Sequence, residues 1–142
     1  MKAEPGEVEE SSVQEVPIGA SGDVVKARQA VRVLAQQARL SLVDQTKLVT
    51  AASELARNTL TYGGGGSMRG SLVRRNVKEG VRVQFSDQGP GIPDLDLALT
   101  DGWSSGRGMG LGLSGAKRLV DEFDLDSEVG KGTVITVIKW AR

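Results

Sequence analysis

Residues 81–94 read VRVQFSDQGPGIPD and combine a strand pattern with a loop rich in glycine and proline. It opens with alternating apolar and polar residues, the period of a strand buried on one face, with Val81, Val83 and Phe85 as the apolar set. Asp87 continues that set, so its carboxylate is expected to point toward the interior. Burying a carboxylate without partners is costly. Either a ligand supplies the donor, for which the exocyclic amine of adenine is suited, or the strand end curls into a turn and Asp87 accepts from the loop.

Two glycines and two prolines shape the loop that follows Asp87. Gly89 and Gly91 let the backbone approach a flat ligand closely, because neither residue carries a side chain. Pro90 and Pro93 restrict the backbone of the same turn. The loop is therefore a candidate binding element.

Upstream of this strand, a helix is predicted over residues 41–62, opened by a cap at Ser41 and stopped by four glycines at 63–66. Its core-facing residues fall within an arc of about 100°; they are Leu48, Ala51, Ala52, Leu55, Thr59 and Tyr62. Glu54 and Asn58 are four residues apart, so they share one face at the edge of this arc. They would line a pocket beside the sheet, although an isolated pair with this spacing is more often a solvent-exposed polar pair.

Downstream, a glycine-rich loop at residues 102–112 leads directly into a helix predicted over residues 113–122. Such a loop exposes successive backbone N–H groups at the positive end of a helix dipole, which suits phosphate oxygens. Arg107 adds a positive charge in its middle. The string G-x-x-x-x-G-K-[ST] is absent and no predicted strand leads straight into the loop, so Walker and Rossmann loops are disfavoured. A phosphate-binding loop and a plain mobile linker both remain open.

The remaining elements complete an α+β domain. Strands are predicted at residues 12–18, 71–77, 81–86, 123–127 and 133–140, with a hairpin turn at 78–80, a helix from Ser21 or Asp23 to about Leu40, and a short helical piece at 95–99. We expect a two-layer sandwich with helices on one face of a mixed, mostly antiparallel sheet. Residues 1–20 hold five Glu and one Lys, a net charge of −4, so residues 1–11 are expected to be a flexible acidic tail and residues 12–142 one domain.

Composition excludes several kinds of chemistry. The 142 residues include neither His nor Cys, which removes imidazole-based triads, phosphohistidine relays within this chain, thiol nucleophiles, disulfides and zinc fingers. Aromatic residues make up 4% of the chain, too few for a nucleic-acid stacking platform. No apolar run approaches the roughly 18 residues of a membrane span, and no signal-peptide pattern opens the chain. We therefore expect a cytoplasmic protein that binds neither nucleic acid nor membrane.

Taken in order, these segments resemble the motifs of the Bergerat ATP-binding fold shared by gyrase, Hsp90, histidine kinases and MutL, the GHKL superfamily. The matching strings are ELARN at 54–58, DQGPG at 87–91, GRGMGLGL at 106–113 and a closing Gly-Thr at 132–133. Within the superfamily the chain resembles the small anti-sigma-factor serine/threonine kinases, in particular the RsbT-type switch kinases of bacterial stress signalling. The resemblance covers about residues 12–142.

The resemblance implies a role for each matching residue. Asn58 would coordinate Mg²⁺, Glu54 would be the general base, and Asp87 would bind the adenine amine with support from Thr133. The glycine-rich loop would close over the triphosphate of ATP, and Arg107 or Lys117 would neutralise the phosphate charge. In this chain Arg107 lies inside the loop, whereas the relatives carry an Arg just before it. The full nucleotide-binding set implied is Asn58, Asp87, Gly89, Gly91, Gly106, Arg107, Gly108, Gly110, Leu111, Gly112, Lys117 and Thr133.

The same resemblance implies an ATP-dependent protein serine/threonine kinase that phosphorylates a STAS-domain antagonist in a partner-switching pathway. The released kinase could then act on a downstream phosphatase or sigma factor. The alternative is an ATP-binding anti-sigma factor that works mainly by sequestering its partner. A stand-alone ATPase fits less well, and a homodimer or larger assembly with partners is left open.

Overall fold

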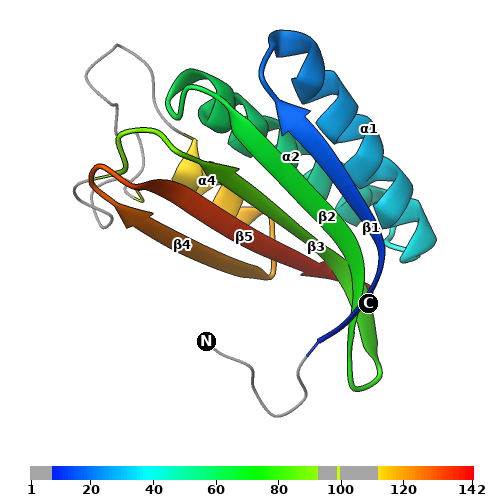
Figure 1. The fold of residues 1–142 in the computed structure, drawn as a ribbon. Coiled ribbons are helices and arrows are strands. Elements are labelled where there is room, and N and C mark those ends of the chain that lie inside the picture. The colour runs from blue at the N-terminus through cyan, green and yellow to red at the C-terminus, as the bar shows by residue number, and fades with distance from the viewer. Residues whose placement is uncertain (1–7, 93–98, 100–111) are drawn as a thin grey trace.

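A five-stranded antiparallel sheet carries helices on one of its faces (Figure 1). The computed structural model describes residues 8–92, 99 and 112–142. The strands run in the order β1-β2-β3-β5-β4; they are β1 Glu9–Ile18, β2 Gly66–Arg75, β3 Lys78–Asp87, β4 Glu122–Glu128 and β5 Gly132–Trp140. The helices are α1 Ser21–Gln37, α2 Leu42–Thr61 and α4 Leu113–Arg118.

The predicted α+β two-layer sandwich is confirmed. All four pairs of neighbouring strands in the described residues are antiparallel, so the sheet, expected to be mixed and mostly antiparallel, has no parallel pair among these residues. The apolar side chains between the layers come from all three described helices and from the inner face of the sheet; the largest of them are Ile18, Leu34, Leu48, Leu55, Met68, Phe85 and Leu113. This core fixes α2 against β3, the two elements that carry the site.

The first turn of α1 differs from the prediction. The N-cap is Ala20, and neither Ser21 nor Asp23 occupies that position. Asp23 instead lies three residues into the helix, where its carboxylate accepts the backbone N–H groups of Gly19 at 2.8 Å and Ala20 at 3.0 Å. These bonds lower the pKa of Asp23. The acid thus satisfies the donors before the helix from inside the first turn.

The predicted start of α2 is confirmed. Ser41 is its N-cap, and the Ser41 hydroxyl accepts the backbone N–H of Asp44 at 3.1 Å. Along the helix, Leu48, Leu55 and Thr59 are buried as their positions in the arc predict.

The β2–β3 hairpin turns two residues earlier than predicted. Arg75 pairs with Lys78, so the loop consists of Asn76 and Val77, with Asn76 at a φ of 59°. Asn tolerates this left-handed conformation, and two-residue turns of that kind match the twist of paired strands. Gly80, taken from the sequence as a turn residue, lies within β3, where a Cβ would overlap the backbone of the neighbouring strand β5.

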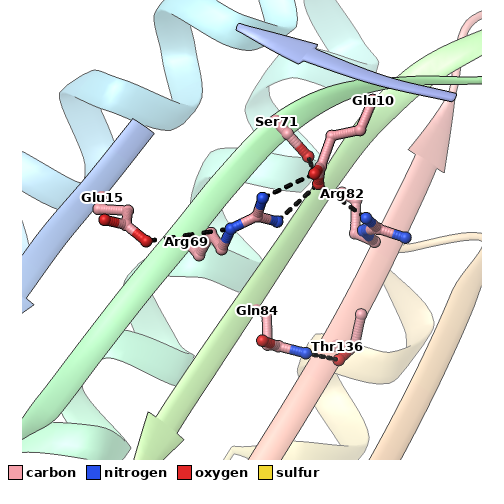
Figure 2. A network of polar contacts seen from close by, with 7 residues as sticks. All are labelled: Glu10, Glu15, Arg69, Ser71, Arg82, Gln84 and Thr136. Atoms are coloured by element: carbon pink, nitrogen blue, oxygen red, sulfur yellow. Dashed lines mark hydrogen bonds and ion pairs between the residues drawn. The ribbon is translucent and has the colours of Figure 1, made fainter. Parts of the chain in front are cut away.

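Strand β1 begins at Glu9, inside the segment 1–11 that the sequence suggested was a tail. Glu10 reaches over the sheet face that carries no helices and binds two strands at once (Figure 2). Its carboxylate accepts Arg69 at 2.6 Å and Arg82 at 2.7 Å, and the hydroxyl of Ser71 at 2.7 Å. The residues that look solvated in the sequence are therefore held by arginines from distant parts of the chain.

A second ionic cluster lies at the end of the sheet where α2 begins, around the buried side chains of Asp44 and Lys139. Lys139 is 4% exposed, and its ammonium lies 3.6 Å from both Asp44 and Asp121. Arg142 pairs with the same two carboxylates. The cluster therefore joins the start of α2 to β5 and to the connection after α4. Removal of one charge would leave its buried partner uncompensated, so the contact is costly to break.

Two further expectations concern the segment between β3 and β4. The helical piece expected at 95–99 lies outside the described residues except for Leu99, which is in a turn. The helix expected over 113–122 ends at Arg118. Among the described residues, none of the helices combines the length and the apolar character needed to cross a membrane.

The Glu10 cluster gives the fold a measurable pH dependence. The hydrogen bond from Arg69 is the largest contribution that lowers the pKa of Glu10 from 4.5 to about 2, with Ser71 and Arg82 adding to it against the opposing effect of burial. A carboxylate whose pKa is lowered by folding stabilises the protein above about pH 4.5, and that stabilisation is lost as the pH falls toward 2.

We expect Glu10→Gln to reduce the free energy of unfolding at pH 7, because the amide cannot form the ion pairs with Arg69 and Arg82. The reduction should be about 1 kcal/mol, since solvent screens these partly exposed arginines. The reduction should disappear near pH 2. Urea unfolding at several pH values measures both. Glu15→Gln is the control, since Glu15 is 74% exposed and lies 4.0 Å from Arg69. Equal losses from both variants would contradict a special role for Glu10.

Candidate functional site

A small cavity lies between α2, α4 and the ends of β3 and β5, and we call it the Asp87 cavity. Its polar lining residues are Asn58, Thr59, Tyr62, Asp87 and Thr133. Its apolar lining residues are Phe85, Ile92, Leu113 and Ile135. The cavity holds about 20 Å³, room for a single water molecule. Larger hollows exist on the surface, but this one gathers the amide, carboxylate and hydroxyl singled out from the sequence.

Asp87 is the last residue of β3 and is half-buried, as the strand period predicts. Burial raises the pKa of its carboxyl group above the ordinary value, and hydrogen bonds from the backbone N–H groups of Gly89 and Thr133 offset part of that rise. The Gly89 bond is 2.9 Å long. The turn interpretation is confirmed, because Asp87 accepts from the loop, while the ligand interpretation stays a prediction for a carboxylate that also lines the cavity.

Three glycines from separate parts of the chain lie directly against Asp87 or its neighbours. A Cβ at Gly63 would overlap the carboxylate of Asp87, and a Cβ at Gly132 would overlap its backbone carbonyl. A Cβ at Gly89 would meet the backbone of Gly63. The left-handed φ of 96° at Gly132 adds a second reason for glycine there. Gly63 was taken from the sequence only as part of the run that stops α2.

The loop after Asp87 is held by two side chains that the sequence did not single out as site residues. The hydroxyl of Tyr62 donates to the carbonyl of Gly91 at 3.0 Å, and the hydroxyl of Ser127 accepts the backbone N–H of Ile92 at 2.8 Å. Ser127 and Thr133 also share a hydrogen bond of 2.8 Å between their hydroxyls. Tyr62 was detectable as a core-facing residue of its helix, whereas no local signal marks Ser127.

The second predicted pair, Glu54 and Asn58, lies on α2 as its spacing requires. Asn58 lines the Asp87 cavity, while Glu54 lies one helical turn earlier and outside that lining. Glu54 faces Gly112 instead, because a Cβ at Gly112 would overlap its carboxylate oxygen Oε2. The other oxygen, Oε1, accepts the guanidinium of Arg57 at 3.2 Å.

The glycine-rich loop lies mostly beyond the part of the chain that the structure describes. Gly106, Arg107, Gly108, Gly110 and Leu111 fall in the segment 100–111, so their predicted contacts with phosphate are not tested. Gly112 is the N-cap of α4 and has a left-handed φ of 68°. Lys117 lies in the last turn of α4 and is exposed, and it is not among the residues that line the Asp87 cavity.

The residues present fit an adenine nucleotide. A half-buried carboxylate at the end of a strand is an acceptor for an exocyclic amine. The space beside Gly89 and Gly91, expected to admit a flat ligand, is filled by the backbone of Gly63 and of Glu128. At about 20 Å³, the cavity admits a base only if its walls move apart. The described residues contain no group of three acidic side chains that could hold a metal. Mg²⁺ would therefore depend on the amide oxygen of Asn58 together with the phosphate oxygens of the nucleotide.

Comparison with known proteins gives the family. The profile of the histidine kinase-, DNA gyrase B- and HSP90-like ATPases matches residues 43–141. The chain belongs to this family, which confirms the resemblance drawn from its motifs.

Among individual proteins, the chain is similar to a serine/threonine-protein kinase and to anti-sigma F factors. The chain is 47% identical over 120 residues to the serine/threonine-protein kinase RsbT of Bacillus subtilis, an alignment that covers 84% of this chain and 90% of the relative. It is 29% identical over 119 residues to an anti-sigma F factor of Pasteuria penetrans, with 80% and 79% coverage. An anti-sigma F factor of Geobacillus kaustophilus is 26% identical over 118 residues, with 80% and 81% coverage.

We expect Asp87→Asn to weaken binding of ATP about tenfold to hundredfold, because an amide offers one acceptor atom where the carboxylate offers two. The NH₂ group of the new side chain would face either the N–H of Gly89 or the adenine amine. Titration calorimetry with Mg-ATP measures the change. Asp124→Asn on exposed β4 is the control, and unchanged affinity in Asp87→Asn would contradict the assignment.

We expect Gly63→Ala to lower ATP affinity at least tenfold and to reduce the free energy of unfolding by about 1–3 kcal/mol, because the new methyl group displaces the Asp87 carboxylate. Thermal unfolding and the same titration measure the two effects. Gly22→Ala lies on α1 with open space around it and should not destabilise the fold. A Gly63→Ala protein with normal affinity would show that the close contact is dispensable.

Proposed function

We propose that this chain is an ATP-dependent protein serine/threonine kinase whose substrate is a STAS-domain antagonist. The observation that carries the proposal is the arrangement along α2. Asn58 reaches the cavity that contains Asp87, and Glu54 lies one turn away beside the start of α4. Family membership supports ATP as the nucleotide, and the likeness to a protein named a serine/threonine-protein kinase supports hydroxyl phosphorylation.

We assign the nucleotide contacts as follows. Asp87 accepts the adenine amine, with Thr133 held beside it by Ser127. Gly89 and Gly91 keep the loop close to the base. Asn58 would hold Mg²⁺, and the ion would supply positive charge to neutralise the phosphate groups. The proposed triphosphate contacts come from Gly106, Arg107, Gly108, Gly110, Leu111 and Gly112, with Lys117 as a second candidate for charge neutralisation.

In the proposed reaction the hydroxyl oxygen of a Ser or Thr on the partner forms a bond to the γ-phosphorus of ATP. The bond between that phosphorus and the oxygen of the β-phosphate breaks, and ADP leaves. Glu54 orients the hydroxyl and takes its proton. This role suits a carboxylate that is only partly buried and lines an open groove, where a protein hydroxyl can reach it.

Two partner arrangements follow from the relatives. Partner switching through a STAS-domain protein, with release of the kinase to a downstream phosphatase, fits the likeness to RsbT. Sequestration of a sigma factor is the alternative, and the likeness to two anti-sigma F factors favours it. A cytoplasmic location, where ATP is available, remains part of the proposal, as does assembly with such partners.

Pull-down from the native host followed by mass spectrometry separates the two arrangements. Recovery of a STAS-domain protein that accepts phosphate from [γ-³²P]ATP supports the kinase. Recovery of a sigma factor without any protein phosphorylation supports sequestration.

We expect Glu54→Gln to lower kcat for phosphate transfer at least a hundredfold, because the amide cannot take the proton. The variant should bind Mg-ATP with normal affinity, since Glu54 is not part of the Asp87 cavity. Transfer of ³²P to the recovered STAS-domain protein measures kcat, and calorimetry checks ATP binding. Glu128→Gln, at an exposed position of β4, is the control. Transfer at the normal rate by Glu54→Gln would exclude Glu54 as the base.

A further inference from the structure

Arg57 and Glu54 form an ion pair on the exposed side of α2. Nη1 of Arg57 lies 3.2 Å from Oε1 of Glu54, and the side chains are 55% and 43% exposed. Within the ranges that the structure describes, each side chain has the other as its one polar partner. A glutamate side chain has three rotatable bonds, so without Arg57 no polar group in the described part of the chain would select one orientation of the carboxylate.

The two carboxylate oxygens of Glu54 face different surroundings. Oε1 is bound by Arg57, and Oε2 lies against Gly112, the residue that opens α4. Gly112 also ends the glycine-rich loop in the sequence. The ion pair therefore fixes one oxygen so that the other stays at the side where the nucleotide phosphates are proposed to lie.

Glu54 and Asn58 line different hollows. Asn58 lines the Asp87 cavity. Glu54 lines a groove of about 380 Å³ between α1 and α2, which we call the α1–α2 groove. Its charged lining residues are Arg28, Arg32, Glu54 and Arg57, and the other four are uncharged side chains of α2. A hydroxyl on a partner protein can approach Glu54 through this open groove.

We propose that Arg57 is a positioning residue for phosphate transfer: it holds the Glu54 carboxylate where the acceptor hydroxyl and the γ-phosphate meet. The inference rests on the proposed function, in which Glu54 takes the proton. Small errors in the placement of a reacting group reduce rates strongly. An exposed ion pair is weak, so its loss should slow the reaction without abolishing it.

The first test compares three variants with the STAS-domain protein recovered from the host and Mg-ATP. We expect Arg57→Ala to lower kcat about threefold to tenfold, with the Kd for ATP unchanged and KM within about twofold. Arg57→Lys keeps a donor cation and should recover most of the lost kcat. Lys47→Ala removes a positive charge from an exposed position of the same helix that does not line the α1–α2 groove, so its kcat should stay normal. Thermal unfolding checks that each variant is folded.

The second test is a double-mutant cycle. If Arg57 acts through Glu54, Arg57→Ala should not slow the residual transfer of Glu54→Ala any further. Equal losses in both backgrounds would overturn the inference, as would a rise in kcat for Arg57→Ala, which would make the ion pair a brake. A loss with Glu54→Ala but none with Arg57→Ala would overturn the role of Arg57 alone. Normal transfer by Glu54→Ala would overturn the base assignment as well.

Discussion

The site depends on the contact between the end of α2 and the end of β3. Gly63 lies directly against the carboxylate of Asp87, with no room for a side chain between them. Because helix and strand meet this closely, the preceding turn of α2 brings Asn58 to the same cavity. Gly89 packs in turn on the backbone of Gly63, so the loop after Asp87 is also held against the segment that ends α2. A larger residue at either glycine would separate the carboxylate from the amide.

Strand register provides the second half of this geometry. Asp87 pairs with Gly66 on β2 and with Thr133 on β5. A shift of one residue in either pairing would turn Asp87 to the face without helices, since side chains alternate between faces. The two-residue turn at Asn76 and Val77 fixes the register of the hairpin at its far end. Residues distant from the cavity thus determine which side chains line it.

The sequence predicted the features that local patterns encode. Strand period placed Asp87 toward the interior, and helix period placed Glu54 and Asn58 on one face of α2. What it missed depends on contacts between distant segments. Glu10 is recognisable as part of a strand only once Arg69 and Arg82 are known to lie beside it. Ser127 falls in a predicted strand, but its hydrogen bond with Ile92 spans 35 positions of the chain and has no local signal.

Helix α2 is anchored at both ends, so its backbone is held in place while its exposed polar side chains can still change orientation. At its start, the buried pair of Asp44 and Lys139 joins it to β5. At its other end, the contact of Gly63 with Asp87 joins it to β3. The helix backbone between these anchors is therefore held in place, and the freedom that remains near the reaction centre belongs to exposed side chains. For Glu54 that freedom is limited by Arg57, so the precision of the proposed base depends on one weak surface ion pair more than on the core.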